Sequence, residues 1–246
     1  MNLVSVIMPA YNSEKTISKS ILSVLSQSYK NIELIICNDF SNDNTQNILN
    51  KFLEKDKRVK VINNSQNYGP GVSRNNALKI SKGLYIAFLD SDDEWPANKL
   101  EKQICFMKKN KIDLCHTNLI EVHSNKKKYR NHKSVVEFKD MLIKNFLATS
   151  TVIINKKMIK YLFVEMRKRQ DYVFWLQNMQ NGLKSVLLNE YLCFYSIRKN
   201  SISNSNKFAH PIYHFKIFYK YMKFSLVKSL IFWFRNIISQ SIKIYD

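Results

Sequence analysis

The sequence predicts an α/β fold, a mostly parallel sheet flanked by helices, with a helical C-terminal tail. Short apolar runs of strand length alternate with segments of helical spacing, which is the order of elements in parallel sheets. Each apolar run then ends in a polar cluster, and in such sheets ligands bind outside the carboxyl ends of the strands. A chain of 246 residues, 45% of them hydrophobic, is long enough to bury a sizeable core.

The first 95 residues show this alternation most clearly. Their apolar runs are nearly continuous, as expected for strands buried on both faces. The expected strands are Leu3–Met8, Ile32–Cys37, Val59–Ile62 and Leu84–Leu89. The expected helices between them are Ser13–Ser28, Thr45–Leu53 and Pro70–Ser81. Ser13 is a candidate cap for the first helix, and Pro70 suits the first turn of the third.

The second half of the chain is less regular. Helices are expected at Leu100–Lys109 and Asp171–Met179. The segments with strand composition are Ile112–Thr117, Thr149–Ile154, Lys184–Leu188 and Tyr191–Ile197. The polar and basic segment Glu121–Lys133 is expected to form a loop or a hairpin. From about Phe208 onward the chain is expected to be helical, and it is rich in aromatic and basic residues.

Charge and cysteine content restrict the function classes. The formal net charge of +20 favours an anionic partner such as nucleic acid, acidic lipid or a phosphate-bearing small molecule. A proteome rich in Lys and Asn would produce the same balance, so charge alone selects no function. The four cysteines form no CxxC pair, which argues against structural zinc. No signal peptide is expected, and no apolar run approaches the roughly 20 residues that span a bilayer.

Four acidic residues follow the fourth expected strand directly, and they are Asp90, Asp92, Asp93 and Glu94. Crowded carboxylates repel one another, and a divalent cation relieves that repulsion. Oxygen ligands suit Mg²⁺ or Mn²⁺, usually shared with substrate phosphates. An acidic turn that caps a helix beginning near Pro96 is the alternative interpretation. Because the acids stand at a strand exit in a basic chain, the metal site is the favoured one.

Four segments resemble the motifs of family 2 glycosyltransferases, in the right order and spacing. The first strand with its exit, Val4–Asn12, is similar to the opening motif of the family, and Glu33–Thr45 to the second. Asn67–Gly69 followed by Ser73–Ala77 resembles the third. Phe88–Trp95 resembles the metal-binding motif. The likeness is strongest to enzymes of teichuronic-acid and lipooligosaccharide synthesis, and it covers all but about the last thirty residues.

This resemblance implies a GT-A, Rossmann-like fold. Residues 1–205 would form the glycosyltransferase domain, with a nucleotide-binding half at 1–95 and an acceptor half at 96–205, and residues 206–246 the tail. The implied nucleotide-sugar-binding residues are Pro9, Ala10, Tyr11, Asn12, Asp39, Asn67, Gly69, Arg74, Asp90, Ser91 and Arg198. Among them, Asp39 would bind the nucleobase and Asp90 the ribose region. Asp92 would hold the metal ion, Mg²⁺ or Mn²⁺.

Asp171 is the candidate general base. It stands in the segment Arg167–Leu176, which resembles the part of the family that carries the base, and nearby cations favour its ionised form. Its spacing alone is also typical of a helix N-cap. The implied reaction is inverting transfer of a hexose from a nucleotide diphosphate, most simply UDP, to a hydroxyl of a glycan or lipid-linked acceptor. The rival interpretations are a nucleotidyltransferase, which usually has a Gly-rich loop after its first strand, and a nucleic-acid-binding protein.

The C-terminal tail suggests where the protein works. Phenylalanine, tyrosine, tryptophan and isoleucine alternate there with lysine and arginine, a composition that suits the interface of an anionic membrane. Packing of the tail on the catalytic domain, or on a second copy of the chain, is the other interpretation. We expect a cytoplasmic protein, peripheral on the inner face of the bacterial membrane, with one face of the tail on the domain and the other on lipid. Nucleic acid is not expected as a partner.

Overall fold

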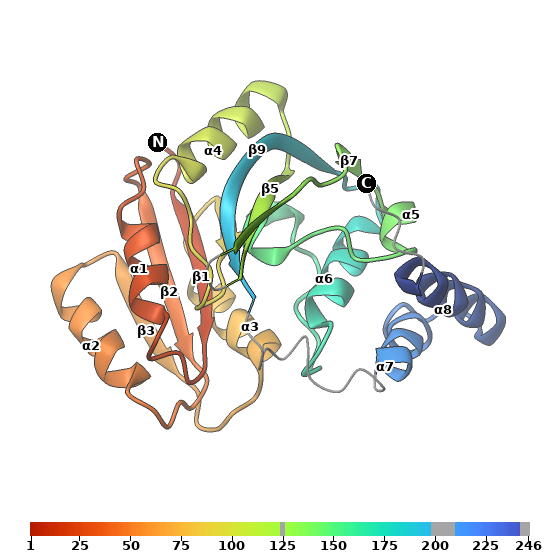
Figure 1. The fold of residues 1–246 in the computed structure, drawn as a ribbon, viewed down its shortest axis with the longest axis horizontal. Helices are drawn as coiled ribbons and strands as arrows, with labels where there is room; N and C mark the ends of the chain where they lie inside the picture. The colour runs from red at the N-terminus through yellow and green to blue at the C-terminus, as the bar shows by residue number, and fades with distance from the viewer. Residues whose placement is uncertain (124–125, 198–209, 242–246) are drawn as a thin grey trace.

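The computed structural model describes residues 1–123, 126–197 and 210–241 of the chain. One sheet runs through the molecule with helices on both faces (Figure 1). Its strands, in spatial order, are β3 (Val59–Asn63), β2 (Ile32–Asn38), β1 (Val4–Ala10), β4 (Tyr85–Phe88), β8 (Ile153–Asn155), β5 (Leu114–His123), β9 (Ser185–Ser196) and β7 (Val135–Val136). A further strand, β6 (Lys126–Arg130), pairs with β5. The predicted α/β class is confirmed.

The first four strands form one parallel part of the sheet, and β5 and β9 form another. Ala10 pairs with Asn38, and Asn38 pairs with Asn63, so β1, β2 and β3 end level with one another. β4 lies on the other side of β1, with Phe88 opposite Ile7. The carboxyl ends of these strands therefore meet at one edge, the lower edge in Figure 1. The predicted gathering of polar strand exits is confirmed.

The helices and short helical turns alternate with these strands. They are α1 (Ile17–Leu25), α2 (Thr45–Lys55), α3 (Pro70–Ile80), α4 (Lys99–Asn110), α5 (Phe138–Met141), the 3₁₀ turns Thr149–Thr151 and Lys156–Met158, α6 (Gln170–Met179), α7 (His210–Lys216), a π-helical turn at Ile217–Tyr221, and α8 (Leu226–Ser241). The predicted capping role of Ser13 is wrong. Helix α1 begins later, after Thr16, and the Ser13 carbonyl accepts hydrogen bonds from the backbone N–H groups of Thr16 and Ile17.

Packing on one face of the sheet fixes the position of α6. Phe174 of α6 stacks on Phe163 with 4.0 Å between ring centroids, and Phe88 of β4 meets both rings edge-on. Trp175 and Phe88 are also in edge-to-face contact, at 5.9 Å. Aromatic pairs of this geometry add to the stabilisation from burial. The N-terminal turn of α6 is thereby held against the strand that ends just before Asp90.

The second half of the sheet departs from the prediction at one strand. Lys184–Leu188 and Tyr191–Ile197 were expected as separate strands but form a single one, β9. Thr117 pairs with Leu188 whereas Asn118 pairs with Tyr191, so two residues bulge out of the ladder. The segment Glu121–Lys133 does contain a hairpin, β5–β6, and β8 runs antiparallel to both of its neighbours.

The C-terminal tail is helical, as predicted, from the point where its description resumes at His210. Ile217 and Phe218 are fully buried in the same core as α6, and Gln177 of α6 donates a hydrogen bond to the Tyr221 carbonyl. One face of the tail therefore packs on the domain. Among the described residues, no helix combines the length and the apolar character needed to cross a bilayer.

Candidate active site

The predicted binding residue Asp39 is the centre of a buried hydrogen-bond network at the edge where the parallel strands end. Its Oδ1 accepts from Asn64 Nδ2 at 2.7 Å and from the Tyr68 backbone N–H at 3.0 Å. Its Oδ2 accepts from the Gly69 N–H at 2.8 Å. Asn64 also donates to Ser73 Oγ, which ties the strand exits to helix α3. Asp39 thus joins three chain segments, and its predicted contact with a nucleobase is compatible with this network because carboxylate oxygens accept several hydrogen bonds.

The exit of β1 carries the other residues predicted to line the nucleobase site. Pro9 and Ala10 are buried at the end of the strand, while the Tyr11 side chain is 45% exposed. Asn12 has a left-handed backbone, φ 46°, and its Oδ1 accepts from the Asn42 N–H at 3.0 Å. Asn tolerates this conformation better than most residues. The loop therefore presents an exposed aromatic ring on a backbone that is fixed by the next loop.

Two further predicted residues precede helix α3. Gly69 has φ 91° and ψ 164°, a conformation that essentially only glycine adopts, although a Cβ there would meet no atom within 4 Å. The requirement for glycine is therefore conformational. Asn67 lies half-buried two residues earlier.

Arg74 and Asp90 form a partly buried ion pair. Arg74 Nη2 lies 2.5 Å from Asp90 Oδ1, and the Phe163 ring covers the guanidinium at 5.4 Å. The Arg74 side chain is only 5% exposed, and its Nε and Nη1 have no hydrogen-bond partner among the described residues. A buried donor without a partner is costly. Unused N–H groups on two nitrogens beside a strand exit suit an anionic ligand such as a diphosphate.

The acidic cluster divides into partly exposed and buried members. Asp92 is half-buried, and Asp90 is exposed enough to reach a ligand. Ser91 is buried, and its Oγ lies 2.8 Å from Ser13 Oγ, so its side chain fixes the loop. The alternative interpretation of these acids as a helix cap is wrong, since α4 begins after Asn98 and no side chain caps it.

Asp93 is the buried member of the acidic cluster, and its hydrogen bonds hold the loop in place. Its Oδ2 accepts from Ser150 Oγ at 2.6 Å, and its Oδ1 from the Ser196 N–H at 3.0 Å. Burial, and then the negative charges of Asp92 and Asp90, raise the pKa of Asp93 well above its usual range. Glu94 exchanges backbone hydrogen bonds with Phe194 of β9. These contacts fasten the acidic loop to β9 in the second half of the sheet.

Asp171 lies in the first turn of α6. The interpretation as an N-cap is wrong, because Arg169 occupies that position with φ 62°. Asp171 Oδ2 accepts a hydrogen bond from Asn145 Nδ2 at 3.0 Å. Burial raises the pKa of Asp171, while Arg74 and Arg169 act in the opposite direction. The charges of Arg74 and Asp90 thus reach Asp171, which places the candidate base at the same site as the ion pair.

Tyr195 of β9 lies within electrostatic range of the four acids. Burial raises the pKa of Tyr195 above its ordinary value of 10.0, and the charges of Asp93, Asp90, Asp92 and Asp171 raise it further. Electrostatic effects of this kind fall off with distance. The acidic loop and the start of α6 therefore both lie near Tyr195.

The carboxylates of this site could hold a divalent metal ion only if a bound substrate supplied further oxygen ligands. Among the described residues, no group of three or more His, Cys, Asp or Glu side chains is arranged to hold a metal ion. Asp90 pairs with Arg74, and Asp93 accepts a hydrogen bond from Ser150. Asp92, which the resemblance assigns to the metal, remains the candidate protein ligand. Mg²⁺ typically binds through one or two carboxylates together with substrate phosphates. The residues therefore fit a cation that is shared with a nucleotide diphosphate.

Some of the site could not be foreseen, and one predicted residue lies outside the described chain. Arg198 falls in the segment that the structure does not describe. Asn64, Ser150, Phe163 and Tyr195 were not assigned roles, and only Asn64, at a strand exit, carried a local signal.

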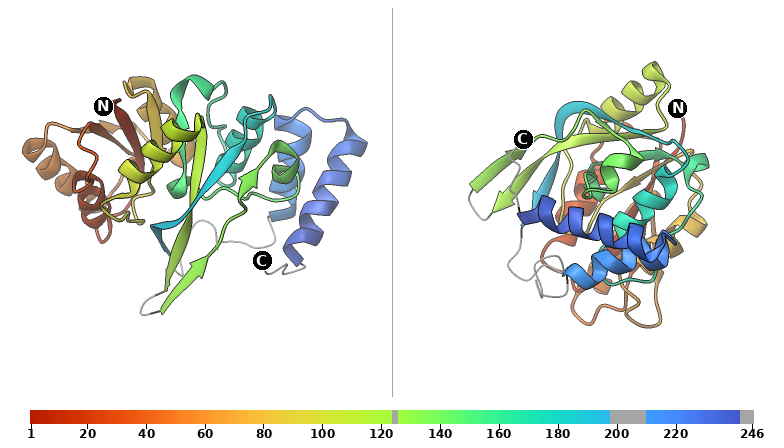
Figure 2. Two further views of the ribbon diagram at one scale, coloured as in Figure 1. Left: turned by 90° about the horizontal axis from the view of Figure 1, so that it is seen from above. Right: turned by 90° about the vertical axis from the view of Figure 1, so that its right-hand side faces the viewer.

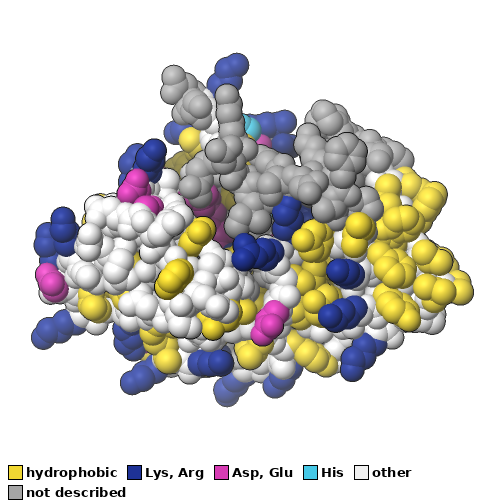
Figure 3. All heavy atoms as spheres, turned by 90° about the horizontal axis from the view of Figure 1, so that it is seen from below, with side chains coloured by type: hydrophobic (Ala, Val, Ile, Leu, Met, Phe, Trp, Pro, Cys, Tyr) yellow, Lys and Arg dark blue, Asp and Glu magenta, His cyan; other side chains and the backbone are white. Residues whose placement is uncertain are grey.

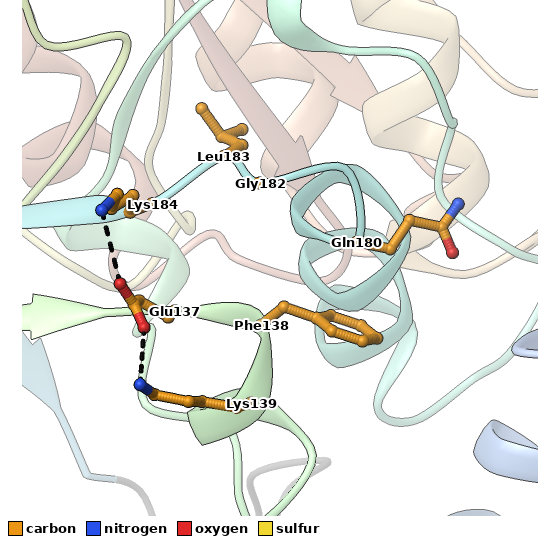
Figure 4. Close-up of a pocket in the computed structure, with 7 residues that line it drawn as sticks. All are labelled: Glu137, Phe138, Lys139, Gln180, Gly182, Leu183 and Lys184. Atoms are coloured by element: carbon orange, nitrogen blue, oxygen red, sulfur yellow. Dashed lines mark ion pairs between the residues drawn. The ribbon is translucent and has the colours of Figure 1, made fainter.

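A cavity of about 330 Å³ contains none of the predicted site residues (Figure 4). There Glu137 pairs with Lys139 and Lys184 between α5 and the turn before β9.

Two curated bacterial proteins are similar to most of this chain. A glucosyltransferase of Escherichia coli, WfaP, is 40% identical over 86% of this chain and 84% of its own; its name gives UDP-Glc as donor and a GlcNAc-diphosphoundecaprenol as acceptor. The putative teichuronic acid glycosyltransferase TuaG of Bacillus subtilis is 36% identical over 83% of this chain and 82% of its own. The predicted likeness to teichuronic-acid enzymes is thereby confirmed.

The fold and the family follow from two further comparisons. The crystal structure of Staphylococcus aureus TarS, residues 1–349 with UDP-GlcNAc, matches with a TM-score of 0.78 at 21% identity, over all of this chain and 76% of that one. This likeness confirms the GT-A fold. The family model "Glycosyl transferase family 2" matches residues 5–215. The chain therefore belongs to glycosyl transferase family 2 and is a glycosyltransferase.

Proposed function

We propose that this chain is an inverting, metal-dependent hexosyltransferase that uses a UDP-sugar and a lipid-linked acceptor. The observation that carries the proposal is the Arg74–Asp90 ion pair, whose charges both act on Asp171 and whose acid belongs to the same acidic loop as Asp92. Arg74 suits a diphosphate, and Asp171 is a carboxylate suited to a base. UDP is the proposed nucleotide because WfaP, by its name, uses UDP-Glc.

The proposed reaction needs a base and a stabilised leaving group. The acceptor hydroxyl attacks the anomeric carbon, its proton passes to Asp171, and the bond from that carbon to the diphosphate oxygen breaks. Attack opposite the leaving group inverts the anomeric centre. A divalent cation bound at Asp92 would neutralise the charge that develops on the diphosphate. Arg74 directs its unpaired N–H groups to the same charge.

The acceptor and the location are proposed together. The name of WfaP specifies an acceptor whose diphosphate is linked to a polyprenyl chain. An acceptor of this class lies in a membrane, and the basic tail suits the anionic lipids of the cytoplasmic leaflet. We infer a peripheral protein at that face, with residues 1–205 as the transferase domain and residues 206–246 as the tail.

A donor screen tests the proposal. Purified protein is given UDP-glucose, UDP-N-acetylglucosamine or GDP-mannose, with a polyprenyl diphosphate-linked sugar and either Mg²⁺ or Mn²⁺. We expect release of UDP from one UDP-sugar, with loss of turnover when a chelator is added. The configuration of the product linkage, read by NMR, reports inversion. Release of pyrophosphate from a nucleoside triphosphate and a sugar phosphate would instead support a nucleotidyltransferase.

A further inference from the structure

The exposed side of the tail carries an apolar surface that the catalytic site does not use. Its hydrophobic side chains are between 42% and 67% exposed, and they are Ile212, Tyr219, Leu226, Val227, Leu230, Ile231, Phe234 and Ile238. We call this set the tail surface. A groove of about 630 Å³ continues it between α7 and α8, where Phe215 and Trp233 complete the lining. Apolar patches of this extent on a soluble protein usually mark an interaction site.

The charges on the tail surface have one sign. Within residues 210–241, the part of the tail that the structure describes, the lysines and the arginine are exposed, and they are Lys216, Lys220, Lys223, Lys228 and Arg235. The sequence contains no Asp or Glu between Tyr191 and Tyr245. Lys216 and Lys220 also line the groove, so cations border the apolar surface directly. The complementary partner is anionic with an apolar interior, which describes an acidic lipid bilayer.

The tail surface lies on the same side of the molecule as the candidate active site. Figure 2 shows α7 and α8 together at one end, beyond α6. Figure 3 looks at the molecule from below, toward the edge where the parallel strands end, and its hydrophobic side chains gather at that same end with lysine and arginine among them. A bilayer against this face would bring a membrane-bound acceptor to the side on which the site lies.

We propose that the tail surface docks on an anionic bilayer, with its apolar side chains below the lipid headgroups and its lysines at the phosphates. This deepens the proposed location at the membrane. A second copy of the chain is the less favourable occupant, because a two-fold interface would place the same basic residues against one another. Docking requires neither donor nor transfer, so it can be tested separately from the reaction.

Vesicle binding by two matched variants tests this docking. The variant V227E/F234E places charge on the tail surface, and the control variant L22E/L53E changes equally exposed residues on α1 and α2. Cosedimentation uses vesicles of phosphatidylcholine with phosphatidylglycerol, and vesicles of phosphatidylcholine alone. We expect binding to the acidic vesicles that salt weakens, at least about tenfold weaker binding by V227E/F234E, and no change in the control.

Three outcomes would overturn the docking. The first is wild-type protein that stays in the supernatant with acidic vesicles. The second is equal binding by wild type and V227E/F234E. The third is a lipid-free dimer that the same double substitution converts to a monomer, which would assign the tail surface to a second copy. Melting temperatures of both variants show that each is folded.

A different contact connects the inner side of α8 to the candidate base. Asn145 donates to Asp171 through Nδ2, and its Oδ1 accepts from the Leu147 N–H at 3.1 Å, which fixes the orientation of the amide. Two residues earlier, the Ile143 carbonyl accepts from Asn236 Nδ2 at 2.7 Å. Asn236 belongs to α8 and is fully buried. The loop that carries Asn145 is therefore held by the tail.

The geometry points to Asn145 as a positioning residue for the Asp171 carboxylate, with Asn236 holding the loop in place. This inference rests on the proposed role of Asp171 as base. Misplacement of a catalytic group by about 1 Å can cost on the order of 100-fold in rate, so a fixed carboxylate matters. Neither amide is expected to touch the donor.

Steady-state kinetics test the positioning role. We expect Asn145→Ala to lower kcat on the order of tenfold with the KM for the UDP-sugar unchanged, and Asn236→Ala to do the same to a smaller extent. Asn110→Ala, at an exposed asparagine of α4, is the control. Unchanged kcat in folded Asn145→Ala would overturn the inference, as would a rise in donor KM equal to the fall in kcat. If Asp171→Asn kept full activity, the proposed function would fail instead.

Discussion

Replacing Asp171 with asparagine is expected to lower kcat by at least about 100-fold, in keeping with the usual contribution of a general base. An amide keeps the size of the carboxylate and can still accept the hydrogen bond from Asn145, but it cannot take the acceptor's proton. Binding of the UDP-sugar should stay close to wild type, because the proposed donor contacts lie at the strand exits whereas Asp171 lies on α6. Turnover assays and titration calorimetry measure the two effects separately.

Glu165→Gln provides the matched control, since Glu165 is an exposed acid six residues earlier in the chain. Asp171→Asn with wild-type turnover would remove Asp171 from the mechanism. The pH profile of wild type gives a second test. Burial raises the pKa of Asp171, and the base acts when ionised. Activity should therefore fall as the pH drops through that pKa, at a higher pH than for an exposed aspartate.

Replacing Asp92 with asparagine is expected to reduce kcat/KM by at least about 100-fold and to remove the effect of metal on donor binding. A cation shared with the diphosphate contributes several kcal/mol to the leaving group, and Asp92 is its candidate protein ligand. Calorimetry with UDP-sugar, with and without Mn²⁺, measures this effect. Wild type should bind more tightly with the metal, whereas the variant should bind equally weakly in both conditions.

The control for Asp92 is Glu54→Gln, which removes one exposed negative charge on α2. Metal-strengthened donor binding that survives in Asp92→Asn would assign the cation to another carboxylate. Asp90 is then the next candidate, although its Oδ1 already meets Arg74.

The placement of the candidate donor-binding residues at one edge of the sheet was predictable, because each follows a strand that local sequence already indicates. Asp39, Asp90 and the loop at Tyr11 each follow a strand that the apolar runs already marked, and parallel strands bring their ends together. Their hydrogen-bond partners were not predictable. Ser150 meets Asp93 across 57 residues of sequence, a contact that no local pattern encodes.

Two errors have identifiable physical causes. The polar pair at Asn189 and Glu190 interrupts the apolar run of β9, which suggested two strands. In the structure these residues bulge, and Asn118 Nδ2 donates to Asn189 Oδ1 at 2.8 Å across the shift in register. The alternative interpretation of Asp171 as a helix cap failed because Arg169 holds that position with a left-handed backbone, which sequence spacing does not reveal for arginine.

The uninterrupted sheet constrains how this enzyme can move. β8 joins β4 to β5 by hydrogen bonds on both of its edges, so the first and second halves of the chain share one continuous sheet. Enzymes with two hinged lobes can close on a substrate by rotating one lobe, but a shared sheet provides no such pivot. Entry of substrate and exit of product must therefore depend on loops. New sugar or acceptor preferences can then arise through exchange of loop residues, with the scaffold left intact.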